Sequence, residues 1–223
     1  INDKPLSIKI SKEIKENIDE FCKKEGITFF IFMLTAYTSF LYRYTDAEDI
    51  IVGTPFTKRD TDILNNIIGY FVNTLPVRTK IETSDTFKDL VSKIRYKILE
   101  ILNNKDVPFE KIVNEISSSR DLQIPNIFQT VLVCQENNYE GEESEFIESI
   151  ETSEDEKFNL TLIVEKSFSE IDIKFKYNSK LYSRKMIEDI SKKFYMWIEG
   201  LLLYPKERLI NISILNDDEI NKQ

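Results

Sequence analysis

A nearly continuous apolar segment, residues 29–41, most constrains how this chain can fold. Thr28 stands directly before it and can cap a helix that runs to about Tyr44. The apolar side chains would then cover most of the circumference of that helix rather than a single stripe. The uninterrupted part of the segment is far shorter than the roughly 20 apolar residues that cross a bilayer. The sequence therefore predicts a deeply buried core helix and no membrane span.

Strand-like patterns recur along the rest of the chain. Residues 6–10 and 171–177 alternate apolar and polar side chains, as half-buried strands do. A polar turn at 167–170 predicts an antiparallel hairpin that ends in the second of them. The other predicted strands are 50–55, closed by Pro55; 75–80, where Pro76 favours a sheet edge; 127–134; 158–165; and a last short strand at 210–215. The acidic residues 136–156 are interpreted as an exposed excursion.

Helical spacing of apolar residues alternates with these strands. The first predicted helix ends near Gly26, a common helix stop. Ser84 or Asp85 is predicted to cap a long amphipathic helix, Pro108 to open a short one, and Ser183 to cap the last. Helices and strands interleave without a repeat or a low-complexity linker. We therefore predict one compact α/β domain, with a mixed sheet flanked by helices.

The chain contains no histidine among its 223 residues. Histidine is the usual general base near neutral pH and the commonest metal ligand in proteins. Its absence excludes Ser-His-Asp triads, Cys-His pairs and histidine zinc sites from this chain, and no pair of carboxylates stands out for acid–base work. We therefore assign no catalytic residue and no metal site. The net charge of −9 also argues against a nucleic-acid-binding surface.

The only cysteines are Cys22 and Cys134, which do not have metal-ligand spacing. Both stand beside apolar residues, so we expect buried, reduced thiols in a cytoplasmic protein. No signal-peptide pattern is found at the start of the chain. The first residue is Ile1 rather than Met, which suggests a piece cut from a longer polypeptide.

Five motifs follow one another through the middle of the chain. They are DIIVGTP at 49–55 with Arg59 after it, IGYFVNTLPVR at 68–78, NKDVPFE at 104–110, Arg120-Asp121 followed by NIFQ at 126–129, and FNLTL at 158–162. Together they resemble the C-terminal motifs of condensation domains from nonribosomal peptide synthetases, which read DIVVGTP, IGxFVNTLxxR, HQDVPFE, RDxSRNPLFQ and FDLTL. Asn104 and Lys105 replace the His-Gln of the third motif, and Asn159 replaces the Asp of the last.

The resemblance implies a two-lobed enzyme with a chloramphenicol-acetyltransferase-like fold, of which residues 1–223 are the C-terminal subdomain alone. The family's HHxxxDG motif, which carries the catalytic histidine, belongs to the preceding half. The implied partners are that N-terminal half and peptidyl carrier proteins. Their 4′-phosphopantetheine arms enter a tunnel between the lobes, and the chain itself is expected to bind no cofactor directly. We expect the isolated chain to have negligible activity.

The resemblance also suggests which residues line the tunnel or face phosphopantetheine: Gly69, Phe71, Asn73 and Thr74. Gly69 allows close backbone approach or a simple turn. Asn73 is either a polar tunnel contact or a buried amide that satisfies local backbone. Structural or docking roles are expected for a second group: Arg59 toward a carrier protein or solvent, Arg78 in an ion pair, Asp106, Pro108 and Phe109 at a helix start, and Arg120 with Asp121 as a loop anchor.

The sequence alone leaves four alternatives to a condensation domain. An epimerisation domain shares the fold, but its typical NYLGQ-like strand is replaced here by FQTVLV at 128–133. A cyclising variant differs mainly in the other half and stays possible. The chain could instead be a non-catalytic module that binds carrier proteins. A lobe of a CoA-dependent acyltransferase is disfavoured by the carrier-type motifs.

Overall fold

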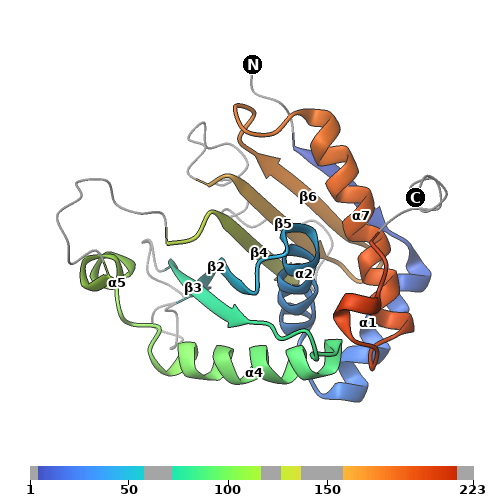
Figure 1. The fold of residues 1–223 in the computed structure, drawn as a ribbon, viewed down its shortest axis with the longest axis horizontal. Coiled ribbons are helices and arrows are strands. Elements are labelled where there is room, and N and C mark those ends of the chain that lie inside the picture. The colour runs from blue at the N-terminus through green and yellow to red at the C-terminus, as the bar shows by residue number, and fades with distance from the viewer. Residues whose placement is uncertain (1–4, 58–71, 117–126, 137–157, 215–223) are drawn as a thin grey trace.

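The structure is a computed structural model, and it describes residues 5–57, 72–116, 127–136 and 158–214. These residues form a six-stranded mixed sheet with the strand order β1-β6-β5-β4-β2-β3 (Figure 1). Its strands are β1 (Leu6–Ile10), β2 (Asp49–Thr57), β3 (Val72–Lys80), β4 (Thr130–Glu136), β5 (Leu160–Lys166) and β6 (Ile171–Tyr177). Strand β4 runs parallel to β2 and β5, and the other pairs are antiparallel. The predicted α/β fold with a mixed sheet is confirmed.

The described helices are α1 (Lys12–Glu25), α2 (Phe29–Thr45), α4 (Phe87–Asn103), α5 (Phe109–Ile116) and α7 (Arg184–Leu203), with a short 3₁₀ helix at Leu209–Asn211. Helix α2 lies against α1, α4 and α7 and is buried over most of its length, as its all-round apolar surface predicts. No single described helix is long and apolar enough to span a membrane, and only α1 and α2 taken together, bent by 106°, reach that length and composition.

The sheet buries apolar side chains on both of its faces. Alternate residues such as Leu132 and Leu162 join the main core beneath α1, α2, α4 and α7. Their neighbours Val131, Val133 and Ile163 point the other way and form a second, smaller cluster with Phe128. Helices α1, α2, α4 and α7 thus lie over one face of the sheet, and the second face carries its own apolar centre.

Most predicted helix ends are confirmed. The side chains of Thr28 and Ser183 accept hydrogen bonds from backbone N–H groups in the first turns of α2 and α7. Helix α1 ends at Gly26 with φ of 63°, a left-handed conformation that favours glycine. The predicted hairpin turn is also present, with Ser167 N donating to Glu170 O at 2.9 Å.

The predicted cap of α4 was wrong. Neither Ser84 nor Asp85 caps this helix; Thr86 does, in a reciprocal capping box with Asp89. The Asp85 carboxylate instead accepts hydrogen bonds from Glu82 N at 2.8 Å and Lys93 Nζ at 2.7 Å. Ser84, Asp85 and Thr86 can each cap a helix, so they compete for this position. The capping box with Asp89 favours Thr86.

The predicted strand at 210–215 was also wrong. The described part of this segment begins with the 3₁₀ helix Leu209–Asn211. Leu209 and Ile212 are both buried, and their three-residue spacing suits one turn of such a helix. Leu209 N donates to Asp85 O at 2.9 Å, which ties the turn to the start of α4.

Several strand boundaries also differ from the prediction. Strand β2 continues past Pro55 to Thr57, because β3 pairs with it along its whole length, from Asp49 opposite Lys80 to Thr57 opposite Val72. Strand β4 begins at Thr130 rather than at 127. Pro76 does lie on an edge strand of the described sheet, as predicted. The predicted excursion at 136–156 falls almost wholly outside the described residues.

Both cysteines are free thiols, as predicted, although each is only half-buried. Burial raises the pKa of the Cys22 thiol to about 12, and burial raises the pKa of the Cys134 thiol as well. The thiolate is the reactive form of cysteine. A pKa of about 12 leaves Cys22 roughly one part in ten thousand ionised at pH 8.

We therefore expect almost no reaction of either thiol with Ellman's reagent in the native protein at pH 8 within minutes. In concentrated urea the protein should release two equivalents of thionitrobenzoate at once, because both thiols then regain ordinary pKa values near 8.5. The burst amplitude at 412 nm measures this difference. A native burst of one equivalent would show that one thiol is not held in the protonated state described here.

Candidate functional site

Motif residues that are far apart in the sequence meet at one end of the sheet. The antiparallel ladder places Pro55, near the end of β2, opposite Thr74, near the start of β3. The parallel pair between β2 and β4 places Gly53 beside Val131. Helix α5 lies close to β3 at the same end (Figure 1). Residues of the first three motifs thus meet in this part of the sheet, and we take it as the candidate site.

Asn73 of β3 connects the third motif, residues 104–110, to the sheet by hydrogen bonds. Its side-chain Nδ2 donates to Lys105 O at 3.0 Å and to Val107 O at 2.8 Å. Lys105 Nζ reaches back to Thr57 O at 3.3 Å, so β2 also holds this segment. Asn73 is buried, and both amide hydrogens are used on backbone carbonyls. Asn73 thus satisfies two backbone carbonyls that lie 32 and 34 positions later in the chain.

Three phenylalanine rings stand together on the second face of the sheet. The rings of Phe109 and Phe128 are 5.4 Å apart between centroids, and those of Phe128 and Phe158 are 5.5 Å apart. The Phe128 ring lies directly over Gly53, where an added Cβ would be 2.3 Å from Phe128 Cε2. A glycine is therefore required for this close approach. The stack joins α5, β2 and the strand starts of β4 and β5.

Asn73 and Thr74 point to opposite faces of the sheet, because successive side chains of a strand alternate. Asn73 shares its face with Leu75 and Val77 of the main core. Thr74 is half-buried on the other face, the one that carries Gly53. The two residues therefore cannot line one surface together.

The other expected site residues fall in several places. Arg78 makes the expected ion pair, with Nη2 2.6 Å and Nε 2.9 Å from the Asp49 carboxylate. This guanidinium holds the pKa of Asp49 below its ordinary value. Pro108 directly precedes α5, and its carbonyl accepts from Lys111 N at 3.0 Å, which confirms the helix start. Asp106 is exposed just before it. Gly69, Phe71, Arg59 and Arg120 lie outside the described residues.

A pair of hydroxyls, buried Tyr37 and half-buried Thr130, lies at the start of β4 on the helix-covered face of the sheet. Tyr37 of α2 hydrogen-bonds to Thr130 Oγ1, and Thr130 Oγ1 donates to Leu160 O at 2.9 Å. Burial raises the pKa of Tyr37, so its phenol stays protonated at neutral pH. Within the described residues, no group of three or more His, Cys, Asp or Glu side chains could hold a metal ion. The described contacts of this site are structural, and they fix where α5 and the strands β2 to β5 lie relative to one another.

Sequence reasoning missed Gly53, Phe128 and Tyr37 as parts of this site. The glycine inside a buried apolar strand was the available signal, since glycine in a strand often marks close backbone or ring approach. The ring that covers it is 75 positions away in the sequence and could not be read from any local pattern.

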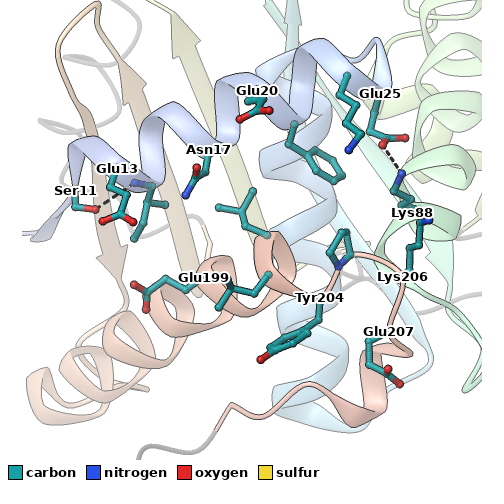
Figure 2. A pocket seen from close by; sticks show the side chains of 16 residues that line it. Ser11, Glu13, Asn17, Glu20, Glu25, Lys88, Glu199, Tyr204, Lys206 and Glu207 are labelled. Atoms are coloured by element: carbon teal, nitrogen blue, oxygen red, sulfur yellow. Dashed lines mark hydrogen bonds and ion pairs between the residues drawn. The ribbon is translucent and has the colours of Figure 1, made fainter.

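A groove on the helix-covered side of the sheet is separate from the candidate site. It has a volume of about 740 Å³ and lies between α1, the end of α7 and residues 204–207. Figure 2 shows Glu13, Glu20 and Glu199 around it, with the Glu25–Lys88 ion pair at one end. None of its lining residues belongs to the five motifs.

Comparison with known proteins finds similarity along the whole chain. The family model of the Condensation domain matches residues 1–223. Gramicidin S synthase 2 of Brevibacillus brevis is 32% identical over 219 residues, which cover 96% of this chain and 5% of that protein. Surfactin synthase subunit 1 of Bacillus subtilis (strain 168) is 30% identical over 222 residues, 98% of this chain and 6% of that protein. The chain thus spans only a small part of these relatives.

Solved structures share the fold at low sequence identity. The four-domain nonribosomal peptide synthetase AB3403 superposes with a TM-score of 0.83 at 18% identity, over 96% of this chain and 18% of that one. The first condensation domain of the CDA synthetase gives 0.76 at 15% identity, over 97% of this chain and 49% of that one. The X-domain in its complex with OxyB from teicoplanin biosynthesis gives 0.81 at 20% identity, over 96% and 48%. The fold is therefore chloramphenicol-acetyltransferase-like, and because the family model matches every residue, the chain belongs to the condensation-domain family.

Proposed function

We propose that this chain is the C-terminal lobe of a condensation domain that forms amide bonds between carrier-protein-tethered aminoacyl or peptidyl thioesters. The reaction would serve nonribosomal peptide synthesis of the kind that makes peptide antibiotics, in the cytoplasm. One observation carries the proposal: 97% of the chain superposes on 49% of a solved condensation domain. The order of the motifs supports the C-terminal half. The proposed partners are the N-terminal half and peptidyl carrier proteins with 4′-phosphopantetheine arms.

In the proposed reaction the acceptor's amine nitrogen attacks the donor's thioester carbonyl carbon. The C–N bond forms, the C–S bond breaks, and the amine proton ends on the departing thiol. This chain has no histidine, so any imidazole that carries the proton belongs to the N-terminal half. The proposed role of this lobe is to hold the two tethered reactants in line. Such positioning can lower the activation free energy by about 7 kcal/mol or more.

Particular residues have distinct roles in this proposal. Thr74 lies on the second face of the sheet and, with Gly69 and Phe71, would face the tunnel. Asn73 would act indirectly, because its amide holds the backbone of Lys105 and Val107 in place beside α5. Arg59 and Arg120 are proposed as docking or anchoring residues. Tyr37 stays neutral and supports the strand starts.

The test is product formation, followed by mass spectrometry of an acceptor-loaded carrier protein. A donor-loaded carrier protein is added, with this chain alone and then with this chain joined to its N-terminal half. We expect extended acceptor only from the joined form. The matched control replaces the second histidine of the upstream HHxxxDG motif by alanine. The extended acceptor should then no longer form. Product from this chain alone would overturn the proposal, because a reaction without histidine would then reside here.

A non-catalytic binding module is the second candidate. The shared fold with an X-domain that was solved in complex with OxyB favours it. In that case the joined form would bind carrier proteins and yet give no extended acceptor. The same experiment separates the two functions.

A further inference from the structure

The groove between α1, the end of α7 and residues 204–207, here called the α1–α7 groove, presents apolar surface to solvent. Ile14 and Phe21 of α1 are buried beneath it, whereas Leu203 and Tyr204, which also line it, are 71% and 60% exposed. Large apolar side chains that are this exposed mark binding surfaces when they stand together in a groove. Its volume of about 740 Å³ lies within the range of roughly 300–1,000 Å³ that is usual for ligand sites.

One end of the groove is negative. Glu13 of α1 and Glu199 of α7 stand there, and Glu20 follows farther along α1 (Figure 2). None of these three carboxylates has a hydrogen-bond or ion-pair partner among the described residues. Glu199 is nevertheless half-buried, and a charge that is partly removed from water without a partner is costly. A cationic group bound at this end would offset that cost.

The opposite end of the groove carries cations. The Glu25–Lys88 ion pair closes this end, and Lys206 lies toward it (Figure 2). Lys206 and Lys24 are exposed and have no ion-pair partner in the part of the chain that the structure describes. Glu207 also stands here, but its carboxylate already accepts hydrogen bonds within its own turn. The groove is therefore negative at one end and positive at the other, with apolar surface between the ends.

We propose that the α1–α7 groove binds a free linear peptide of about five residues with apolar side chains. Its amino end would lie at Glu13 and Glu199, and its carboxyl end at Lys24 and Lys206. Helix α1 rises about 16 Å from Glu13 to Lys24, a distance that about five residues of extended peptide span. Opposite charges at the two ends belong to a free peptide, since an internal segment of a protein has neither. This binding is separate from the amide-forming reaction proposed above.

The test is isothermal titration calorimetry of the joined two-lobe enzyme with the peptide leucyl-seryl-leucyl-seryl-leucine. We expect saturable binding at one site. Acetylation of the amino end removes the positive charge of the peptide, and amidation of the carboxyl end removes its negative charge. Each change should weaken binding roughly tenfold, because each leaves one end of the groove without its counter-charge. The absence of binding, or equal Kd values for the free peptide and both capped peptides, would overturn the proposal.

Substitutions in the enzyme locate the site. Glu13→Gln with Glu199→Gln should weaken binding of the free peptide roughly tenfold and leave the acetylated peptide unchanged, because that peptide has no ammonium to lose. The matched control is Glu16→Gln with Glu188→Gln, two carboxylates of the same helices that do not line the groove, and it should bind like the parent enzyme. Equal weakening by the control would place the peptide elsewhere and overturn the assignment. Thermal unfolding identifies a variant that does not fold, and the capped peptides then still test the site on the parent enzyme.

Discussion

Replacing Gly53 by alanine is expected to lower the free energy of unfolding by about 2 kcal/mol and to disorder the end of the sheet where the motifs meet. The new Cβ would stand 2.3 Å from Phe128 Cε2, well inside van der Waals contact. The ring cannot simply retreat, because Phe109 and Phe158 both pack against it. Urea unfolding followed by the fluorescence of Trp197 measures the change.

Gly200→Ala is the matched control for this prediction. Its Cβ would meet only the Cγ2 methyl of Ile212 at 2.8 Å, and alanine is favoured over glycine by about 1 kcal/mol inside a helix such as α7. We expect a much smaller loss there. In a double-mutant cycle, Gly53→Ala should cost little once Phe128 is also replaced by alanine. If Gly53→Ala were as well tolerated as Gly200→Ala, the ring-over-glycine contact would be ruled out.

Asn73→Asp is the second large effect that we expect. The aspartate carboxylate has no hydrogens to donate, and it would face the carbonyl oxygens of Lys105 and Val107, now 3.0 and 2.8 Å from the amide nitrogen. Two lost hydrogen bonds and two repelled carbonyls should together cost about 3 kcal/mol at neutral pH. Freed from this clamp, the segment before α5 should shift, and product formation by the joined enzyme should fall roughly 10- to 100-fold.

The stability of the Asn73→Asp variant should depend on pH. Burial beside carbonyl oxygens would raise the pKa of an aspartate at position 73 above its unfolded value. Such a group stabilises the fold fully below the unfolded pKa, and the stabilisation is lost as pH rises through the folded pKa. The variant should therefore approach the parent protein in stability as pH falls. Asn73→Leu, which lacks any charge, should be destabilised about equally across the same pH range. A pH-independent loss in Asn73→Asp would contradict the carbonyl clamp.

Local features of the fold could be predicted from the sequence. The caps at Thr28 and Ser183 depend on side chains that bond to backbone only three residues away. The burial of α2 follows from apolar residues on all of its sides. Arg78 was expected to pair with a carboxylate, and it does so with Asp49 on the neighbouring strand. Each of these conclusions needed only short-range pattern or simple charge pairing.

Long-range features could not be predicted in the same way. The cap of α4 was misplaced by one or two residues, because Ser84, Asp85 and Thr86 can each accept the same hydrogen bond. The contact of Phe128 with Gly53 depends on the parallel register of β2 and β4, which no local pattern encodes. The family resemblance directed attention to Asn73 and Thr74 together, whereas strand geometry places them on opposite faces.

The position of β1 at one edge of the sheet has a consequence for how the chain folds as it is made. Ile10 pairs with Ile171, about 160 residues later in the chain. A ribosome that adds roughly 5–20 residues per second needs on the order of 10–30 s to supply that partner. Throughout this interval the apolar surface of α2 lacks the shelter of α7, and for about the first half of it α2 lacks α4 as well. We therefore expect newly made chains to be most prone to aggregation and chaperone capture before β6 emerges, and refolding to be slow for a domain of this size.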